Sequence, residues 1–264
     1  MISIKTSREI ELMKIAGEIT YDTHKHLEKF IKPGITTNEL DKLAESYILK
    51  NNATPAFKNY GGFPKTICTS VNEQVVHGIP SNYKLKDGDI ISIDIGVCYK
   101  GYYGDSAWSY PVGKVNDEKL YLLEHTEKSL YEGLNQIKPN NRLGDISNAI
   151  EEYAKKHNLG IVKELVGHGI GNKLHEAPDI PNYGEKNKGI ILKPGMVFAI
   201  EPMLNFGSEK IVLEEDDFTI STYDNSPSAH FEHTVLVTED GYKILTKRWF
   251  KWQKKKLLRW MVKY

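Results

Sequence analysis

The sequence predicts an α+β protein made of two similar halves, and three observations support this prediction. Residues 31–47, IKPGITTNELDKLAESY, resemble residues 137–153, IKPNNRLGDISNAIEEY, at an offset of 106 positions. Residues 85–94, LKDGDIISID, match residues 192–201, LKPGMVFAIE, at an offset of 107 positions. In each half, segments with helical spacing of apolar residues precede segments that resemble strands. The period is too long for a solenoid repeat, so we expect two halves related by a pseudo-two-fold axis.

Two helices are expected at the beginning of each half. In the first half the apolar positions run from Ile10 to Leu27, and in the second half they include Leu120, Leu123 and Leu130. The second helix of each half should begin near Thr37 or Gly144, after a turn that contains proline. Four histidines lie on these helices among charged residues and are expected to be solvated: His24, His26, His125 and His157.

Strand-like segments complete each half. In the first half, IISIDIGVCY (90–99) and GYYGDSAWSY (101–110) are expected to form a hairpin around the Lys100–Gly101 turn. In the second half, MVFAIEPML (196–204) and HFEHTVLVT (230–238) are the matching segments. Helices that cover a curved antiparallel sheet would give the α+β arrangement.

Composition indicates an ordinary globular protein of the cytoplasm. Of the 264 residues, 40% are apolar and 27% are charged, and no run of 18 apolar residues is present. The amino-terminal segment has charges within its apolar stretch and no cleavage site of small residues, unlike a secretory signal. Cys68 and Cys98 form no evident disulfide framework, which favours a reducing compartment.

Charge is unevenly distributed along the chain. Residues 247–264 carry eight Lys or Arg and no acid, so residues 1–246 hold 27 basic and 35 acidic residues, a net charge of −8. We therefore divide the chain into a folded body, residues 1–246, and a basic, aromatic tail, residues 247–264.

The repeat places two carboxylates at equivalent positions. Asp94 and Glu201 are each expected at the end of an apolar strand, facing one another across the pseudo-symmetry axis. Burying an isolated carboxylate costs several kcal/mol or forces it to take up a proton, and a divalent metal ion is the natural compensation.

Further candidate ligands lie in the same strands and turns. Taken alone, Asp105 could be a turn residue, His168 in GHGIG a loop histidine and Glu201 the end of a strand. The repeat, however, pairs the acids independently of any argument about function. Four carboxylates and one imidazole are too rich in oxygen for a structural zinc site. They favour a two-metal centre of Mn, Fe, Co or Zn. The candidates are Asp94, Asp105, His168, His175, Glu201 and Glu232.

These motifs resemble those of the type I methionine aminopeptidases of the bacterial kind, which have the pita-bread fold. The matching segments are NEQVVHGIP, SIDIG, GYYGDSAWS, GHGIG, LHEAP, EPML and FEHTV, within a resemblance from about Thr6 to Leu245. The resemblance implies that two divalent ions are bridged by Asp105 and Glu232. It further implies one ion bound by Asp94 and the other by His168 and Glu201, with His77 and His175 contacting the substrate.

The implied activity is removal of the initiator methionine from nascent polypeptides, with a preference for a small second residue. A water shared by two metal ions has a lowered pKa, and the resulting bridging hydroxide would attack the first peptide carbonyl. Glu201 would carry the proton to the leaving amine, and His77 and His175 would hydrogen-bond the scissile peptide. The free α-amino group would bind one ion, which accounts for exopeptidase action.

The same resemblance implies an apolar pocket for the methionine side chain, lined by Phe57, Tyr60, Phe63, Cys68 and Phe218. Such a surface suits a thioether, although composition alone also fits an ordinary core. Many bacterial relatives have Cys, Phe and Trp where this chain has Phe57, Leu174 and Phe218. These three departures leave the range of substrates open.

Two other functions compete with this one. The first is a proline-specific peptidase of the prolidase or aminopeptidase P kind, although such enzymes usually carry a large extra amino-terminal domain. The second is a pseudo-enzyme that binds nucleic acid or the ribosome through the tail. Its aromatic residues Trp249, Trp252 and Trp260, interleaved with cations, favour ribosomal RNA over a membrane surface. The chain is expected to act as a cytoplasmic monomer, and its physiological metal is not determined by the ligand set.

Overall fold

The structure, a computed structural model, describes residues 2–248, so the tail prediction concerns residues that lie almost wholly outside the described part. The first half contains α1 (Ser7–Leu27), α2 (Thr37–Lys50), β1 (Thr54–Pro55), the 3₁₀ turn η1 (Tyr60–Gly62), β2 (Cys68–Val71), β3 (Gln74–Val76), β4 (Ile90–Tyr99) and β5 (Tyr102–Pro111). The second half contains α3 (Asp117–Leu134), α4 (Leu143–Lys156), β6 (Gly160–Ile161), β7 (Gly167–Gly169), β8 (Glu176–Ile180), β9 (Val197–Ile200), β10 (Met203–Asn205), β11 (Ile211–Leu213), β12 (Ile220–Thr222), β13 (Ser228–His230), β14 (His233–Val237) and β15 (Tyr242–Ile244). The α+β prediction is confirmed, as are the predicted beginnings of α2 and α4 and the hairpin of β4 and β5.

The duplication is visible in equivalent contacts of the two halves. An isolated β-bridge joins Thr36 to Lys84 in the first half, and its counterpart joins Arg142 to Ile191 in the second. Directly after each bridge a helix begins, and a carboxylate three residues beyond the cap accepts the cap's backbone N–H: Glu39 at 2.8 Å and Asp145 at 2.7 Å. This carboxylate satisfies a backbone donor that the helix itself leaves free. The repeated IKP segments therefore encode repeated turn-to-helix junctions.

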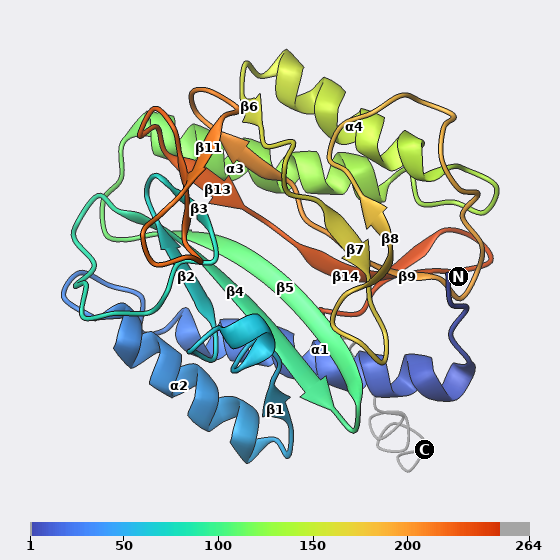
Figure 1. Cartoon of the computed structure of the whole chain (residues 1–264), viewed down its shortest axis with the longest axis horizontal. Helices are drawn as coiled ribbons and strands as arrows, with labels where there is room; N and C mark the ends of the chain where they lie inside the picture. Colours follow the sequence, from blue (N-terminus) through green and yellow to red (C-terminus); the bar gives the residue numbers. More distant parts are fainter. Residues whose placement is uncertain (1, 249–264) are drawn as a thin grey trace, which may run out of the picture.

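Helices flank the strands at two opposite ends of the molecule, as Figure 1 shows with α1 and α2 at one end and α3 and α4 at the other. In the first half, β4 pairs with β5 along one edge and with β1 and β2 along the other. In the second half the order is β15-β14-β9-β7-β8, with two small sheets, β13-β10-β6 and β11-β12-β3, beside it. Each half has its own buried apolar cluster, so each sheet is held against its helices by burial of aliphatic side chains.

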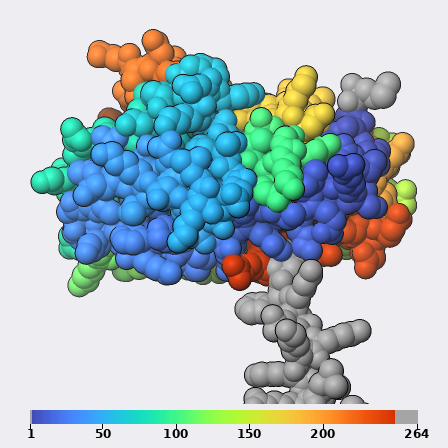
Figure 2. Space-filling view, turned by 90° about the horizontal axis from the view of Figure 1, so that it is seen from below, coloured from blue at the N-terminus to red at the C-terminus, as the bar shows by residue number. Residues whose placement is uncertain are grey.

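Helix α1 lies directly against the hairpin that carries two of the acids. A Cβ atom on Gly104 would lie 2.6 Å from the backbone N of Gly17, so the two glycines allow helix and strand to approach closely. In Figure 2, α1 and α2 lie side by side in blue, and the red carboxy-terminal segment emerges beside α1. The hairpin is thus fixed from behind, which leaves its other face free to line a site.

A short seam joins the halves where β5 meets the segment between β13 and β14. The N–H of Glu232 donates to the carbonyl of Ala107 at 2.8 Å, and the N–H of Asp105 donates to Thr234 Oγ1 at 2.9 Å. Ser106 Oγ donates to the carbonyl of Glu232 at 2.7 Å. Hydroxyl side chains here replace part of a regular strand ladder, and they bring acids from the two halves to one place.

Three sequence expectations need correction. Asp94 was expected at the end of a strand, but it is the fifth of the ten residues of β4. The strand predicted across residues 230–238 is interrupted at Phe231 and Glu232, because β13 pairs with β10 whereas β14 pairs with β9. His24 was expected to be solvated but is fully buried, with its ring stacked 4.6 Å from that of Trp108. Its Nε2 lies 2.9 Å from the carbonyl oxygen of Ser106, and burial lowers its pKa to about 3.

No helix within residues 2–248 is long and apolar enough to cross a membrane.

Candidate metal centre and substrate pocket

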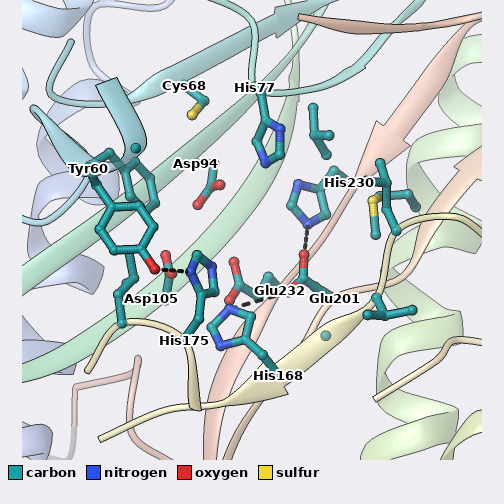
Figure 3. A pocket seen from close by; sticks show the side chains of 18 of the residues that line it. Tyr60, Cys68, His77, Asp94, Asp105, His168, His175, Glu201, His230 and Glu232 are labelled. Carbon is teal, nitrogen blue, oxygen red and sulfur yellow. Dashed lines mark hydrogen bonds and ion pairs between the residues drawn. The ribbon is translucent and has the colours of Figure 1, made fainter. Parts of the chain in front are cut away.

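The predicted site residues line a single cavity of about 580 Å³ between the two halves. Figure 3 shows that its acidic and imidazole side chains point toward a common space. The cavity contains every candidate that the sequence singled out, namely Phe57, Tyr60, Phe63, Cys68, His77, Asp94, Asp105, His168, His175, Glu201, Phe218 and Glu232, and also Leu174. Their roles remain predictions, but their convergence allows them to act as one site.

The acids of the hairpin share one face of the sheet. In the β4–β5 register Asp94 lies opposite Ala107 and Asp105 lies opposite Gly96. Side chains two residues apart on a strand point to the same side, so both carboxylates face the cavity. Asp105 then converges with His168 and Glu232, because one ligand atom from each of these three lies within 4.8 Å of the others. Glu201 lies beside this group, with its Oε1 at 3.6 Å from His168 Nε2.

His168 is held on β7 by two glycines. A Cβ on Gly167 would lie 2.4 Å from the carbonyl oxygen of Ala199, and a Cβ on Gly169 would lie 2.4 Å from that of Ala177. Only glycine therefore fits on either side of His168. The Nδ1 of His168 lies 2.9 Å from the carbonyl oxygen of Gly169, which fixes the proton on Nδ1. The lone pair of Nε2 is then free for a cation.

The carboxylates of the cavity are held at abnormally high pKa values. Burial is the main cause, and it raises the pKa of Asp105 to about 7. The pKa values of Asp94, Glu201 and Glu232 are raised well above their ordinary values by burial and, secondly, by the other acids of the group. Four neighbouring carboxylates without a cation could not all ionise at neutral pH.

Several buried carboxylate oxygens of the cavity have no hydrogen-bond partner among the described residues. Within residues 2–248, no hydrogen bond reaches Asp94 Oδ1, Asp105 Oδ1 or Glu232 Oε1, although each atom is buried. Buried polar atoms are rarely left without partners, because desolvation is then uncompensated. Divalent cations would satisfy these oxygens and offset their mutual repulsion. The donor set of carboxylate oxygens and one imidazole nitrogen fits such ions.

Two further histidines face the cavity without joining the converging group. His77 follows β3 with φ of 59°, a left-handed conformation that is costly for a residue with a side chain. Gly78 follows because a Cβ there would lie 2.2 Å from the carbonyl oxygen of Thr69. The Nδ1 of His175 lies 2.7 Å from the hydroxyl oxygen of Tyr60. Burial lowers the pKa of both imidazoles, so both are neutral near pH 7.

The loop that carries His175 is anchored to the beginning of the chain. Lys5 is buried, and its Nζ lies 2.6 Å from Glu176 Oε2. The N–H of Lys173 donates to the other oxygen of Glu176 at 3.2 Å. A Cβ on Gly171 would strike the Lys5 side chain at 2.4 Å, so the loop closes tightly over this ion pair. Residues distant in sequence thus fix the position of His175.

An apolar wall lies beside the acids of the hairpin. Phe63 and Phe218 meet edge to face with their ring centroids 5.5 Å apart, and Phe57 packs over Gly96, where a Cβ would lie 2.5 Å from its ring. Cys68 lies opposite Asp94 in the β2–β4 register, and burial raises the pKa of its thiol. Tyr60 is the exposed member of this wall, at 48%. An apolar recess beside an acidic group suits a substrate with an apolar side chain next to a polar reacting centre.

One histidine of the cavity was missed by the sequence analysis. His230 received no role there, yet it lines the cavity and its Nε2 lies 3.5 Å from Glu201 Oε2. The signal was present in the sequence HFEH, because alternation puts His230 and Glu232 on the same side of an extended chain.

Fold and site together define a metal-dependent hydrolase with a recess for an apolar side chain. The model of metallopeptidase family M24 matches residues 11–239. The chain is 55% identical over 247 residues to methionine aminopeptidase 1 of Bacillus subtilis, which covers 94% of this chain and 100% of the relative. The crystal structure of a methionine aminopeptidase from Thermotoga maritima superimposes with a TM-score of 0.93 at 44% identity, covering 94% of this chain and 100% of the other. The chain belongs to the methionine aminopeptidases of metallopeptidase family M24, and the predicted resemblance and pita-bread fold are confirmed.

The proline-specific alternative shares the fold but fits the chain less well. The prolidase of Pyrococcus furiosus superimposes with a TM-score of 0.73 at 27% identity, and this chain covers only 66% of its length. That difference agrees with the expectation that such enzymes carry a further domain.

Proposed function

We propose that this chain removes the amino-terminal methionine from nascent polypeptides at the cavity between its two halves, with two divalent metal ions as cofactors. The observation that carries the proposal is the convergence of five candidate ligands and an apolar wall in one cavity. In this proposal the ions would be held by Asp94, Asp105, His168, Glu201 and Glu232. The ions are of the Co, Mn, Fe or Zn type.

When bound, such ions would polarise a carbonyl and lower the pKa of a water molecule. The protein's own groups do the rest. Glu201 carries a proton from the water to the leaving amine, which its position beside His168 supports. His175, tied through Nδ1 to the hydroxyl of Tyr60, presents Nε2 to the scissile peptide, and His77 is held in a strained conformation at the other side. Both neutral imidazoles can donate to an oxygen that becomes negative during the reaction.

Selectivity for methionine follows from the apolar wall. Phe57, Phe63, Cys68 and Phe218 present aromatic and sulfur surface, which accommodates a flexible thioether well. The free α-amino group of the substrate, placed among the carboxylates, favours a chain terminus over an internal peptide bond.

A small second residue is expected to be strongly preferred. With Mn²⁺- or Co²⁺-loaded protein, kcat/KM for Met-Ala-Ser should exceed that for Met-Leu-Ser by at least about tenfold, or about 1.4 kcal/mol of barrier. The physical reason is crowding around the scissile bond, where Tyr60 and His175 are in contact and His77 faces them. Release of free methionine from matched tripeptides is the measurement.

The same assay tests the proposed function against its nearest rival. Ala-Pro peptides should remain intact under conditions in which Met-Ala-Ser is hydrolysed. Cleavage of Ala-Pro at a comparable rate would contradict the proposal, and equal kcat/KM for the Ala and Leu tripeptides would contradict the crowded second position.

For its partners, we propose that the chain acts in the cytoplasm as a monomer and that the tail, residues 247–264, contacts ribosomal RNA. The eight cations and interleaved aromatic residues of the tail support this proposal, since cations bind phosphates and aromatic rings stack on exposed bases. At its beginning the tail is tied to the body, because Arg248 donates to both carboxylate oxygens of Asp22 on α1 at 2.8 Å.

Deletion of residues 249–264 should weaken salt-sensitive association with ribosomes and leave peptide turnover unchanged, because every candidate site residue lies between Phe57 and Glu232. Co-sedimentation of full-length and truncated protein with ribosomes, at low and moderate salt, measures this. Equal sedimentation of both forms would exclude a ribosome role. Binding of only the full-length form to anionic vesicles would instead favour a membrane surface.

A further inference from the structure

His230 is a buried imidazole whose Nε2 has no hydrogen-bond partner within the described chain. It is the last residue of β13 and is only 2% exposed. A neutral imidazole always carries one N–H group and one bare nitrogen, and a buried donor without an acceptor is costly. The ring therefore needs a partner inside the cavity.

The nearest acceptor is a proposed metal ligand. His230 Nε2 lies 3.5 Å from Glu201 Oε2, whereas the other oxygen of the same carboxylate, Oε1, lies 3.6 Å from His168 Nε2. Glu201 thus sits between two imidazoles, as Figure 3 shows.

The two imidazoles are not equivalent. The proton of His168 is on Nδ1, which faces the carbonyl oxygen of Gly169, so its Nε2 is a bare lone pair. A bare nitrogen and a carboxylate oxygen repel one another unless a cation lies between them. His230 has no such constraint, and its Nε2 can carry the proton that Glu201 Oε2 would accept.

The backbone of His230 is fixed firmly enough for this task. Its N–H donates to Ser109 Oγ at 3.0 Å, and its carbonyl oxygen accepts from the same hydroxyl at 2.9 Å. It also pairs with Met203 in the β10–β13 register. A side chain on a rigidly held backbone can orient a neighbouring metal ligand, as residues around metal sites commonly do.

We propose that His230 is a positioning residue that donates from Nε2 to Glu201 Oε2 and so keeps Oε1 directed toward His168 and the metal position. This inference rests on the proposed role of Glu201. A carboxylate held through one oxygen binds a cation through the other, and it presents a defined oxygen for proton transfer. Loss of the bond should therefore lower kcat and metal affinity, with little effect on substrate binding in the apolar recess.

Three substitutions separate this role from packing. The amide nitrogen of Gln can occupy the place of histidine Nε2, whereas that of Asn occupies the place of Nδ1, and Leu offers no donor. His230→Asn and His230→Leu should lower kcat on Met-Ala-Ser by about 10- to 100-fold with KM nearly unchanged, and His230→Gln should restore most of the loss. Thermal unfolding identifies any variant that fails to fold. If the Asn or Leu variant does not fold, the Gln variant, which is polar and of similar size, still tests the proposal.

A second readout does not depend on catalysis. Metal-free protein is titrated with Co²⁺ and followed by visible absorption, which reports both the number of bound ions and their coordination. We expect wild type and His230→Gln to bind alike, and the Asn and Leu variants to bind the same number of ions about 10- to 100-fold more weakly.

Several outcomes would overturn the proposal. Rescue by Asn rather than Gln would show that Nδ1 of His230, and not Nε2, makes the hydrogen bond. Wild-type behaviour of all three variants would show that His230 does not position Glu201. Equal impairment of all three would indicate packing alone. Loss of one Co²⁺ equivalent in His230→Gln would make His230 a metal ligand instead. Failure of the proposed function would look different: wild type would release no methionine, while the Co²⁺ pattern of the variants persisted.

Discussion

Replacing Asp105 with Asn is expected to lower kcat/KM on Met-Ala-Ser by at least about 10³-fold, or about 4 kcal/mol of barrier. Asp105 belongs to the converging group with His168 and Glu232, and its Oδ1 is buried without a partner. Asn keeps the shape but removes the negative charge that a divalent ion requires. Steady-state kinetics at saturating metal, together with the metal content after dialysis, measure the effect.

Asp41 provides a matched control for the loss of a buried acid. It is also buried, and its Oδ1 accepts the backbone N–H groups of Thr66 and Ile67 at 2.8 and 3.1 Å, outside the cavity. Asp41→Asn should lower the melting temperature but leave metal content and turnover of the folded protein close to wild type. Retention of more than about a tenth of wild-type activity by Asp105→Asn, with full metal content, would refute the assignment of Asp105 as a ligand.

The second large effect concerns His175. Its substitution by Ala should reduce kcat by about 10²- to 10³-fold, the usual cost of removing a donor to a developing negative oxygen. Metal content should remain that of wild type, because Nδ1 of His175 is bonded to Tyr60 and the ring is not part of the converging group. Kinetics and metal analysis of the same preparation test both statements.

Tyr60→Phe is the control for this prediction. It keeps the aromatic surface but removes the hydroxyl that orients His175, so it should lower kcat less than removal of the imidazole does. A His175→Ala protein that has lost metal would show that His175 is a ligand and not a substrate contact.

Much of this site could be predicted because its residues belong to local patterns. The hairpin of β4 and β5 placed Asp94 and Asp105 on one face through simple alternation, and the duplicated turns predicted where α2 and α4 begin. The glycines on either side of His168 are required by neighbouring backbone, because a Cβ on Gly167 or Gly169 would meet the carbonyl oxygen of Ala199 or Ala177.

Other features depend on contacts that no local pattern contains. His24 follows a helical sequence that looks solvated, but α1 lies across β5 and buries the ring against Trp108. The anchoring of the His175 loop by Lys5 joins residues 171 positions apart. Neither contact has a periodic signal, because each is produced by the packing of elements that are distant in the chain.

By itself the sequence determined the α+β class, the two halves, the family and the identity of the candidate ligands, since these follow from residue order, spacing and matching motifs. The tertiary structure alone decided how Glu201 lies between His168 and His230, and how β5 joins the second half through Glu232. The physical reason is that spacing along a strand or helix is set by the backbone, whereas distances between atoms of different elements are set by how their side chains pack.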